Sequence, residues 1–583
     1  MDMRIPLGAG LAALVILPMS VALLNQTALT PFRFGDAGSQ TIAIPVTESV
    51  EDAAPPVAER EAVEGQRAAD AVAASEPLPA PMPMPTIAPQ MEMMTRGVAP
   101  SVMPSPGFGM AAGAGDQFTS FEEGGVLRVV DAPVSTFSVD VDTASYAYVR
   151  RMLEMGQLPQ PDAVRVEELI NSFSYDYAQP EGETPFATRV DIAPSPWNPD
   201  NQLMRIGIAG EAVDLSALPP VNLVFLIDTS GSMDSPDKLP LLKRAFAMLV
   251  AELGPDDTVS IVTYAGNAGV ALEPTPASDR AAILDALERL VPGGSTAGAD
   301  GINAAYRLAE QTMVDGGVNR VLLATDGDFN VGISDPDALE RLIARKREEG
   351  ISLSVLGFGT GNYNDAIMQA LAQAGNGNAA YIDGLTEARR VLVEEMGGTL
   401  MTIAQDVKVQ IEFNPAAVSE YRLIGYETRA LDREDFNNDA VDAGDIGAGH
   451  TVTALYEITP AGAPGSADPL RYQNEEAAVP AGPADELAYL KLRYKEPGAD
   501  ESVLIEVPIL AEDAQASLAA AGADMQFATA VAAFGQKLRG SDAVAAMDWD
   551  AIRALAVAGR GADEDGRRAE FIRLVDLAAG LEG

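Results

Sequence analysis

The apolar run from Val221 to Ile227 leads directly into Asp228-Thr229-Ser230-Gly231-Ser232, and this junction constrains the fold most. The run is apolar except for Asn222 and contains β-branched residues, and such a run bounded by polar turn residues predicts a buried parallel strand. In open α/β sheets, ligands bind outside the carboxyl ends of the strands, which is where this turn falls. One carboxylate and two hydroxyls at alternate positions can converge on a small hard cation. Such oxygen ligands favour Mg²⁺ or Mn²⁺ over zinc or copper.

Apolar strands alternate with amphipathic helices from Val221 to about Met396. Because parallel strands must be joined through crossover helices, this alternation predicts an α/β fold with a doubly wound, mostly parallel sheet.

Two more polar segments are expected at the same edge of that sheet. Gly293-Gly294-Ser295-Thr296 follows a predicted helix, and the apolar strand at 321–324 leads into Thr325-Asp326-Gly327-Asp328. An isolated Asp-x-Ser-x-Ser is also a common helix or turn cap, but its combination with these two segments, in this order, favours a metal site. Asp328 is expected to be a solvated loop acid.

Five residues of these three segments could form the metal site: Asp228, Ser230, Ser232, Thr296 and Asp326. Together they resemble the metal-ion-dependent adhesion site of the von Willebrand factor type A domain, in a Rossmann-like sheet. The resemblance implies that Ser230, Ser232 and Thr296 touch the metal through their hydroxyls. It implies that Asp228 and Asp326 act largely through water, and that one coordination position is left for an acidic group of a partner.

Composition excludes several kinds of site. The formal net charge is -46, from 85 Asp and Glu against 39 Lys and Arg, so binding to nucleic acid or anionic lipid through a basic patch is not expected. The chain has no cysteine, which excludes disulfides, thiolate metal sites and cysteine nucleophiles. Its one histidine, His450, is expected to be a partly exposed loop residue without a catalytic role.

The N-terminal segment predicts export. Residues 5–24 form a nearly uninterrupted apolar run, long enough for a signal peptide or a membrane anchor, and the two alternatives stay open. We therefore assign residues 1–30 to a leader or anchor and expect an extracytoplasmic protein, in the periplasm or at the cell surface. Residues 31–130 are rich in Pro, Ala and Met without periodicity and are expected to be a disordered linker.

Four further regions follow the linker. Residues 131–220 resemble the N-terminal companion region of bacterial von Willebrand A proteins, and 221–398 are assigned to the type A domain itself. Residues 399–510 contain alternating segments that predict a β-rich domain, and 511–583 predict amphipathic helices. These last two regions resemble the uncharacterised domain that follows the type A domain in that bacterial family. Because strands are expected on both sides of the α/β unit, we infer that it is inserted in or flanked by a β-rich domain, with its metal edge facing away from this host.

Three weaker motifs have simpler explanations. Asp140-Val141-Asp142-Thr143 resembles a phosphatase nucleophile loop, but the strand before it alternates polar and apolar residues, so a structural role is expected. Asp435, Asn437 and Asp439 match the first ligand positions of an EF-hand, but the later positions do not fit, which favours a solvated acidic loop. The linker methionines are expected to be filler and not copper ligands.

The function that these observations favour is a metal-dependent protein-binding module, for adhesion or scaffolding, that captures an Asp or Glu carboxylate of a protein partner through Mg²⁺ or Mn²⁺. A structural envelope protein whose metal only braces the loops is the alternative. A metal-dependent hydrolase is less favoured, because no base or nucleophile is evident near the motif and Lys238, the nearest lysine, is expected to open a helix face. No enzymatic activity is therefore expected.

Overall fold

The computed structural model describes residues 115–182, 184–213, 219–265, 268–293, 298–327, 336–466, 482–483 and 485–582. The predicted leader and residues 31–114 of the predicted linker lie outside them. Within the described ranges, no helix is both long and apolar enough to cross a membrane.

The predicted linker ends before residue 130. Gln117 pairs with Asn364 in an isolated bridge, and β1 (Leu127–Arg128) pairs with a strand near residue 420. Val129 is buried, and Phe118 packs in the core beside Tyr148. This segment is ordered because its apolar side chains and its backbone find partners, which the low periodicity of the sequence did not indicate.

The region from 221 to 400 forms the predicted mostly parallel sheet, with its strands described here in spatial order. They are β10 (Ala379–Ile382), β9 (Ser352–Phe358), β8 (Val318–Thr325), β5 (Val221–Asp228), β6 (Thr258–Tyr264) and β7 (Ala268–Pro276). Neighbours pair in parallel except β7, which runs antiparallel to β6 at one edge. The edge strands β7 and β10 were not singled out from the sequence, because β7 is wholly half-buried or exposed and β10 has only four residues.

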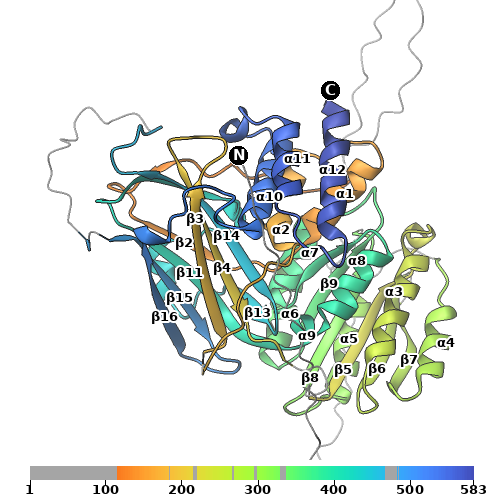
Figure 1. Cartoon of the computed structure of the whole chain (residues 1–583). Helices are drawn as coiled ribbons and strands as arrows, with labels where there is room; N and C mark the ends of the chain where they lie inside the picture. Colours follow the sequence, from red (N-terminus) through yellow and green to blue (C-terminus); the bar gives the residue numbers. More distant parts are fainter. Residues whose placement is uncertain are drawn as a thin grey trace, which may run out of the picture. The chain divides into compact units, whose positions relative to one another are not determined.

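Helices cover both faces of this sheet (Figure 1). Leu223, Phe225 and Ile227 of β5 face one cluster, while Val224 and Leu226 face the other, as strand alternation requires. The first face is covered by α3 (Leu239–Glu252), α4 (Arg280–Glu288), α8 (Leu385–Arg389) and the π-helix η4 (Arg390–Glu394). The second face is covered by α5 (Gly298–Gln311), α6 (Pro336–Glu348), α7 (Asp365–Ala374) and α1 (Ala144–Glu154). The short helix α9 (Met396–Leu400) ends the unit.

Strands from before and after the α/β unit pair with one another. The first of two antiparallel sheets contains, in spatial order, β1, β12 (Val418–Ile424), β14 (Thr451–Pro460), β4 (Gln202–Gly210) and β3 (Phe186–Pro194). The second contains β13 (Gly444–Gly447), β11 (Thr402–Phe413), β15 (Glu486–Lys495) and β16 (Ser502–Leu510), with β2 (Val134–Ser138) also on β11. Because β4 pairs with β14 and β2 with β11, the α/β unit is inserted in a β-rich host, as predicted.

The two antiparallel sheets share one apolar core. Met204, Ile206 and Ile208 of β4 lie in the same buried cluster as Val409 and Ile411 of β11. The outer face of the first sheet is covered by helices from both ends of the described chain. They are α1, α2 (Val166–Asn171), α10 (Ala523–Arg539), α11 (Trp549–Ala558) and α12 (Arg567–Glu582). Short 3₁₀ helices complete the structure: η1 (Pro161–Ala163), η3 (Gly231–Met233), η5 (Glu427–Arg429), η6 (Arg433–Asn437), η7 (Ala511–Asp513) and η8 (Asp542–Val544).

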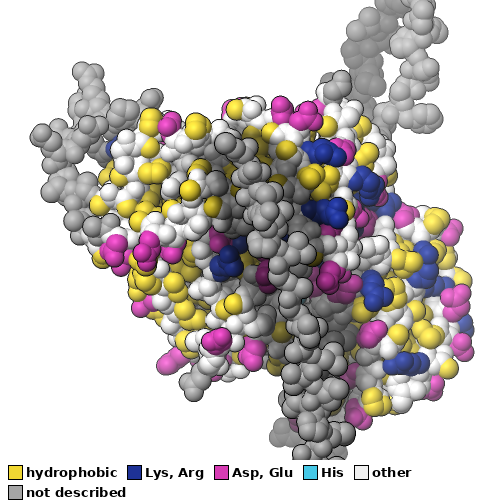
Figure 2. Space-filling model, viewed as in Figure 1, with side chains coloured by type: hydrophobic (Ala, Val, Ile, Leu, Met, Phe, Trp, Pro, Cys, Tyr) yellow, Lys and Arg dark blue, Asp and Glu magenta, His cyan; other side chains and the backbone are white. Residues whose placement is uncertain are grey.

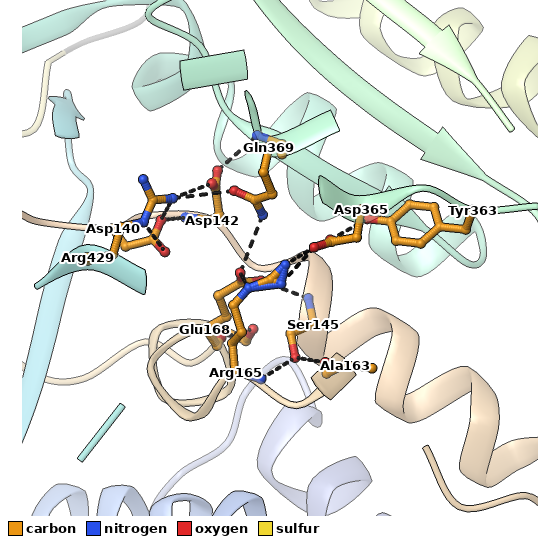
Figure 3. A network of polar contacts seen from close by, with 12 residues as sticks. Asp140, Asp142, Ser145, Ala163, Arg165, Glu168, Tyr363, Asp365, Gln369 and Arg429 are labelled. Atoms are coloured by element: carbon orange, nitrogen blue, oxygen red, sulfur yellow. Dashed lines mark hydrogen bonds and ion pairs between the residues drawn. The ribbon is translucent and has the colours of Figure 1, made fainter. Parts of the chain in front are cut away.

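A buried polar network joins host and α/β unit (Figure 3). Arg429 of η5 binds Asp140 and Asp142, both at 3.0–3.1 Å, in the loop that joins β2 to α1. Arg165, just before α2, binds Glu168 at 2.9 Å and Asp365 at the start of α7 at 2.8 Å. The Arg165–Asp365 pair fixes the orientation of α7 relative to the N-terminal region, since its two partners lie on different elements.

The candidate metal site at the carboxyl edge of the central sheet

Asp228 and Asp326 lie at the carboxyl ends of adjacent strands. β5 and β8 run in parallel, with Ile227 opposite Ala324, so Asp228 ends one strand and Asp326 directly follows the other. From here the chain continues towards β6 on one side and towards β9 on the other, which makes this the topological switch point of the sheet. Both carboxylates are fully buried. The prediction that these two acids share one edge is confirmed by the strand pairing.

The turn after β5 brings its two serine hydroxyls together in a hydrogen bond. The Ser230 backbone N–H donates to Asp228 Oδ1 at 2.7 Å, which folds the turn back over the strand end. The hydroxyl oxygens of Ser230 and Ser232 lie 2.9 Å apart. Ser230 is buried, whereas Ser232 is exposed to solvent at the rim.

Asp326 is held by three polar partners. Lys238 Nζ donates to Asp326 Oδ2 at 2.9 Å and to Asn362 Oδ1 at 3.1 Å. Burial alone would raise the pKa of this carboxyl, but hydrogen bonds from Ser232, Asn362 and Lys238 outweigh it and hold the pKa below 3.8. Asp326 is therefore ionised at neutral pH, as a metal-binding carboxylate must be.

The expectation that Lys238 only opens a helix face is wrong. It precedes α3 as the N-cap residue, but its side chain turns into the site and the residue is buried. Its aliphatic stem crosses Gly359, where an added Cβ would lie 2.3 Å from Lys238 Cε. A glycine is needed there both for this close approach and for its φ of +76°. Lys238 follows Ser232 by only six residues, and this closeness in sequence could have indicated that its side chain reaches the site. Nothing in the sequence near Asn362 indicated that this residue contacts Lys238 and Asp326.

Thr325 and Gly327, on either side of Asp326, complete the site. Thr325 Oγ1 lies 3.5 Å from Asp228 Oδ2 and accepts the Gly327 backbone N–H at 3.2 Å, which links the two strand ends. Gly327 has φ of +96° and lies against the loop after β9, where an added Cβ would come within 2.6 Å of the Asn362 carbonyl oxygen. This glycine lets the Asn362 loop approach Asp326.

The donor set of the described site fits a hard divalent cation. Two carboxylates and two hydroxyls are oxygen ligands of the kind that Mg²⁺ and Mn²⁺ prefer. Two oxygens bound to one Mg²⁺ at about 2.1 Å and roughly at right angles lie about 3 Å apart, which matches the serine pair. The Lys238 ammonium shows that the site already accommodates a positive charge against Asp326. In the described ranges, no group of three or more His, Cys, Asp or Glu could hold a metal, so the fit depends on the hydroxyls.

Thr296 and Asp328, the remaining residues of the predicted motifs, lie outside the described residues. The role assigned to Thr296 stays a prediction.

From the sequence we inferred that the metal edge faces away from the host. The structure shows instead that parts of the N-terminal region contact this edge. Arg151 of α1 forms an ion pair with Asp237, next to Lys238. The Asp116 carboxylate accepts the backbone N–H groups of Gly361 and Tyr363, on either side of Asn362, at 2.8 and 3.0 Å. These contacts arise because α1 packs on a face of the α/β sheet, which strand placement alone could not indicate.

The weaker sequence motifs have structural roles. Asp140 and Asp142 bind Arg429 and form no phosphatase-type loop. Asp439 accepts hydrogen bonds from Arg493 and Ser502, which ties its loop to β15 and β16. The His450 ring packs on the Gly398 backbone, and burial lowers the pKa of the imidazole below 6.5.

Comparison with known proteins identifies the family. A model described as von Willebrand factor type A domain matches residues 222–391, and a von Willebrand factor model matches 112–205. A model described as uncharacterized protein YfbK, C-terminal, matches 398–581. The chain is 48 % identical over 472 residues to the uncharacterized protein YfbK of Escherichia coli K12, covering 80 % of this chain and 81 % of that protein. The chain belongs to the YfbK family of von Willebrand factor type A proteins.

Membership of the YfbK family confirms the resemblance seen in the sequence and the predicted fold class. A second relative, the uncharacterized protein sll0103 of Synechocystis, is 31 % identical over 204 residues, covering 34 % of this chain and about half (47 %) of that protein. Among solved structures, the von Willebrand factor type A protein from Catenulispora acidiphila is similar with a TM-score of 0.38 at 18 % identity, covering 69 % of this chain and 91 % of that structure.

Proposed function

We propose that this protein is a metal-dependent protein-binding module of the cell envelope. In this proposal, Mg²⁺ or Mn²⁺ lies at the switch point among Asp228, Ser230, Ser232, Thr296 and Asp326. The cation supplies the positive charge that captures an Asp or Glu carboxylate of a protein partner. The chain's own residues orient the ion and leave the rim open.

One observation carries the proposal: the Ser230 and Ser232 hydroxyls lie 2.9 Å apart beside two buried carboxylates at the end of β5 and β8. Two carboxylates buried at adjacent strand ends are costly, and Lys238 contributes one positive charge beside Asp326. A divalent cation between the two strand ends would stabilise both carboxylates.

Ser232 suits the capture of a partner, because it is exposed and at the rim. The net charge of -46 would repel an acidic partner elsewhere on the surface. On the face shown in Figure 2, Lys and Arg side chains are scattered among Asp and Glu side chains, which does not favour a nucleic-acid partner. The apolar run at 5–24 supports an extracytoplasmic location, with the membrane reached only through this segment.

The experiment that tests the proposal is titration calorimetry of the full chain with Mg²⁺ and with Mn²⁺. Each titration is repeated with an excess of a capped peptide that contains one glutamate, and with its glutamine counterpart. Ser232→Ala removes one donor of the site and leaves the Lys238–Asp326 ion pair in place, and Asp256→Ala in an exposed turn is the control.

We expect saturable binding in the wild type and in Asp256→Ala, at least tenfold weaker binding in Ser232→Ala, and tighter binding with the glutamate peptide alone. No binding by the wild type under any of these conditions would overturn the proposal. Metal binding that the glutamate peptide leaves unchanged would favour the alternative, a structural protein whose metal braces the loops.

A further inference from the structure

The candidate metal site contains its own cation. Lys238 Nζ lies 2.9 Å from Asp326 Oδ2 and 3.1 Å from Asn362 Oδ1, and its side chain is only 9 % exposed. The stem is held in place by its passage over Gly359. The ammonium is therefore a fixed part of the site and not a mobile surface charge.

The ammonium changes the charge that an entering metal ion meets. Its positive charge lies 2.9 Å from Asp326 Oδ2 and offsets the charge of that carboxylate. Because cation affinity follows the charge of the ligand set, a divalent ion beside Asp326 is held less tightly with this ammonium present than without it, and the two cations repel one another in a buried place.

The carboxylate of a partner would offset this repulsion. It would bring one negative charge to the open coordination position, and both the metal ion and the Lys238 ammonium would attract it. By linkage, a carboxylate that strengthens metal binding is itself bound more tightly in the presence of metal, by the same factor.

We infer that Lys238 makes the metal and the acidic partner bind interdependently: its ammonium weakens the binding of the metal alone and strengthens the coupling to a partner carboxylate. This inference rests on the proposed function. In it, Lys238 is a positioning and charge-balancing residue that lies beside the ion without being a ligand. The site would fill with metal mainly when a partner is present.

The test compares Lys238→Met, which removes the charge and keeps the length of the stem, with the wild type in the full chain. Mg²⁺ affinity is measured by calorimetry with and without the capped glutamate peptide. Lys238→Arg keeps the charge. Lys243→Met is the matched control, because Lys243 lies on the same helix α3 and donates to the Glu288 carbonyl oxygen at 2.8 Å, away from the site.

We expect Lys238→Met to bind Mg²⁺ about tenfold more tightly than the wild type in the absence of peptide. The gain in Mg²⁺ affinity on adding the glutamate peptide should be several-fold smaller in Lys238→Met than in the wild type. Lys238→Arg should keep weak binding and strong coupling, and Lys243→Met should behave as the wild type. Thermal melts without metal show which variants are folded, and Lys238→Arg tests the inference if Lys238→Met does not fold.

Equal or weaker Mg²⁺ binding by folded Lys238→Met would overturn the inference and would show that Lys238 only holds Asp326 in position. So would Mg²⁺ binding by Lys238→Arg that is tighter than the wild type or insensitive to the peptide. Either outcome leaves the proposed function standing, because the wild type still binds. Absence of both Mg²⁺ and Mn²⁺ binding in the wild type, with and without peptide, would instead overturn the proposed function.

Discussion

The Arg165 guanidinium donates to the Asp365 carboxylate at 2.8 Å, across 200 residues of sequence. Arg165 precedes α2 in the host, and Asp365 is the first residue of α7 in the inserted α/β unit. Asp365 also accepts the hydroxyl of Tyr363 at 3.1 Å, one residue from Asn362 in the candidate metal site. The joint between host and insert is thus connected to the metal edge by side chains that the structure holds in contact.

Arg165→Met should destabilise the protein strongly. The change leaves the Asp365 and Glu168 carboxylates buried without their shared cation, and loss of one partner of a buried pair costs about 3–5 kcal/mol. Urea unfolding followed by circular dichroism measures the loss. The comparison is Lys346→Met, whose partners Glu310 and Glu349 are exposed, and for which less than about 1 kcal/mol is expected. Equal losses in the two variants would contradict this account of the joint.

Gly327→Ala should disturb the metal edge more than a glycine substitution elsewhere. An alanine at its φ of +96° is strained by about 1–3 kcal/mol, and its Cβ would also press on the Asn362 loop. Gly316→Ala is the control, since its φ of +70° brings similar strain but a Cβ there meets nothing within 4 Å. We expect only Gly327→Ala to weaken Mg²⁺ binding, measured by calorimetry. Weakening in both variants would mean that general instability, and not the loop contact, is responsible.

Asp116→Ala should loosen the loop that carries Asn362. The Asp116 carboxylate accepts the backbone N–H groups of Gly361 and Tyr363 and the Tyr148 hydroxyl. Loss of a charged acceptor of backbone N–H groups corresponds to about 1.5–3 kcal/mol, so the two amides should exchange hydrogen at least tenfold faster. Hydrogen–deuterium exchange with mass spectrometry detects this in peptides that cover 359–365. Glu122→Ala, at an exposed position of the same segment, should leave this exchange unchanged.

Stability should fall as the pH rises through about 7. Burial, followed by repulsion from Glu427 and Asp140, raises the pKa of Glu167 from 4.5 to about 7. A carboxyl whose pKa is higher in the folded than in the unfolded protein contributes stability that is fully present below about pH 4.5 and is lost as the pH rises through about 7.

In Glu167→Gln, the free energy of unfolding should therefore fall less steeply with pH, by up to about 1.4 kcal/mol per pH unit between pH 5 and 7. Urea midpoints measured at half-unit steps from pH 5 to 8 test the expectation. A Glu167→Gln curve parallel to the wild-type curve would show that Glu167 does not titrate in this range. Asp142 and Asp445, whose pKa values burial also raises to about 7, should keep part of the slope in the variant.

Much of the central sheet was evident from local sequence. The strand at 221–228 is an apolar run broken only by Asn222 before it ends at Asp228, and the strand at 258–264 combines Val, Ile and Tyr with Thr and Ser; both patterns are typical of strands. β7 was missed because its side chains are half-buried or exposed, and β10 was missed because it has only four residues. The linker boundary was placed too late, because a few apolar side chains such as Phe118 suffice to dock a segment that has no periodicity.

The sequence by itself determined the residue types at the strand ends: Asp228, Ser230 and Ser232 lie within five residues, and the turn between them is a local structure. Only the tertiary structure decided which charges meet. Lys238 reaches Asp326 across 88 residues, and Arg429 reaches Asp140 across 289. Periodicity reports which face of an element is buried, whereas the partner of a buried charge depends on how distant elements pack. The positive charge inside the candidate site therefore became visible only in the folded chain.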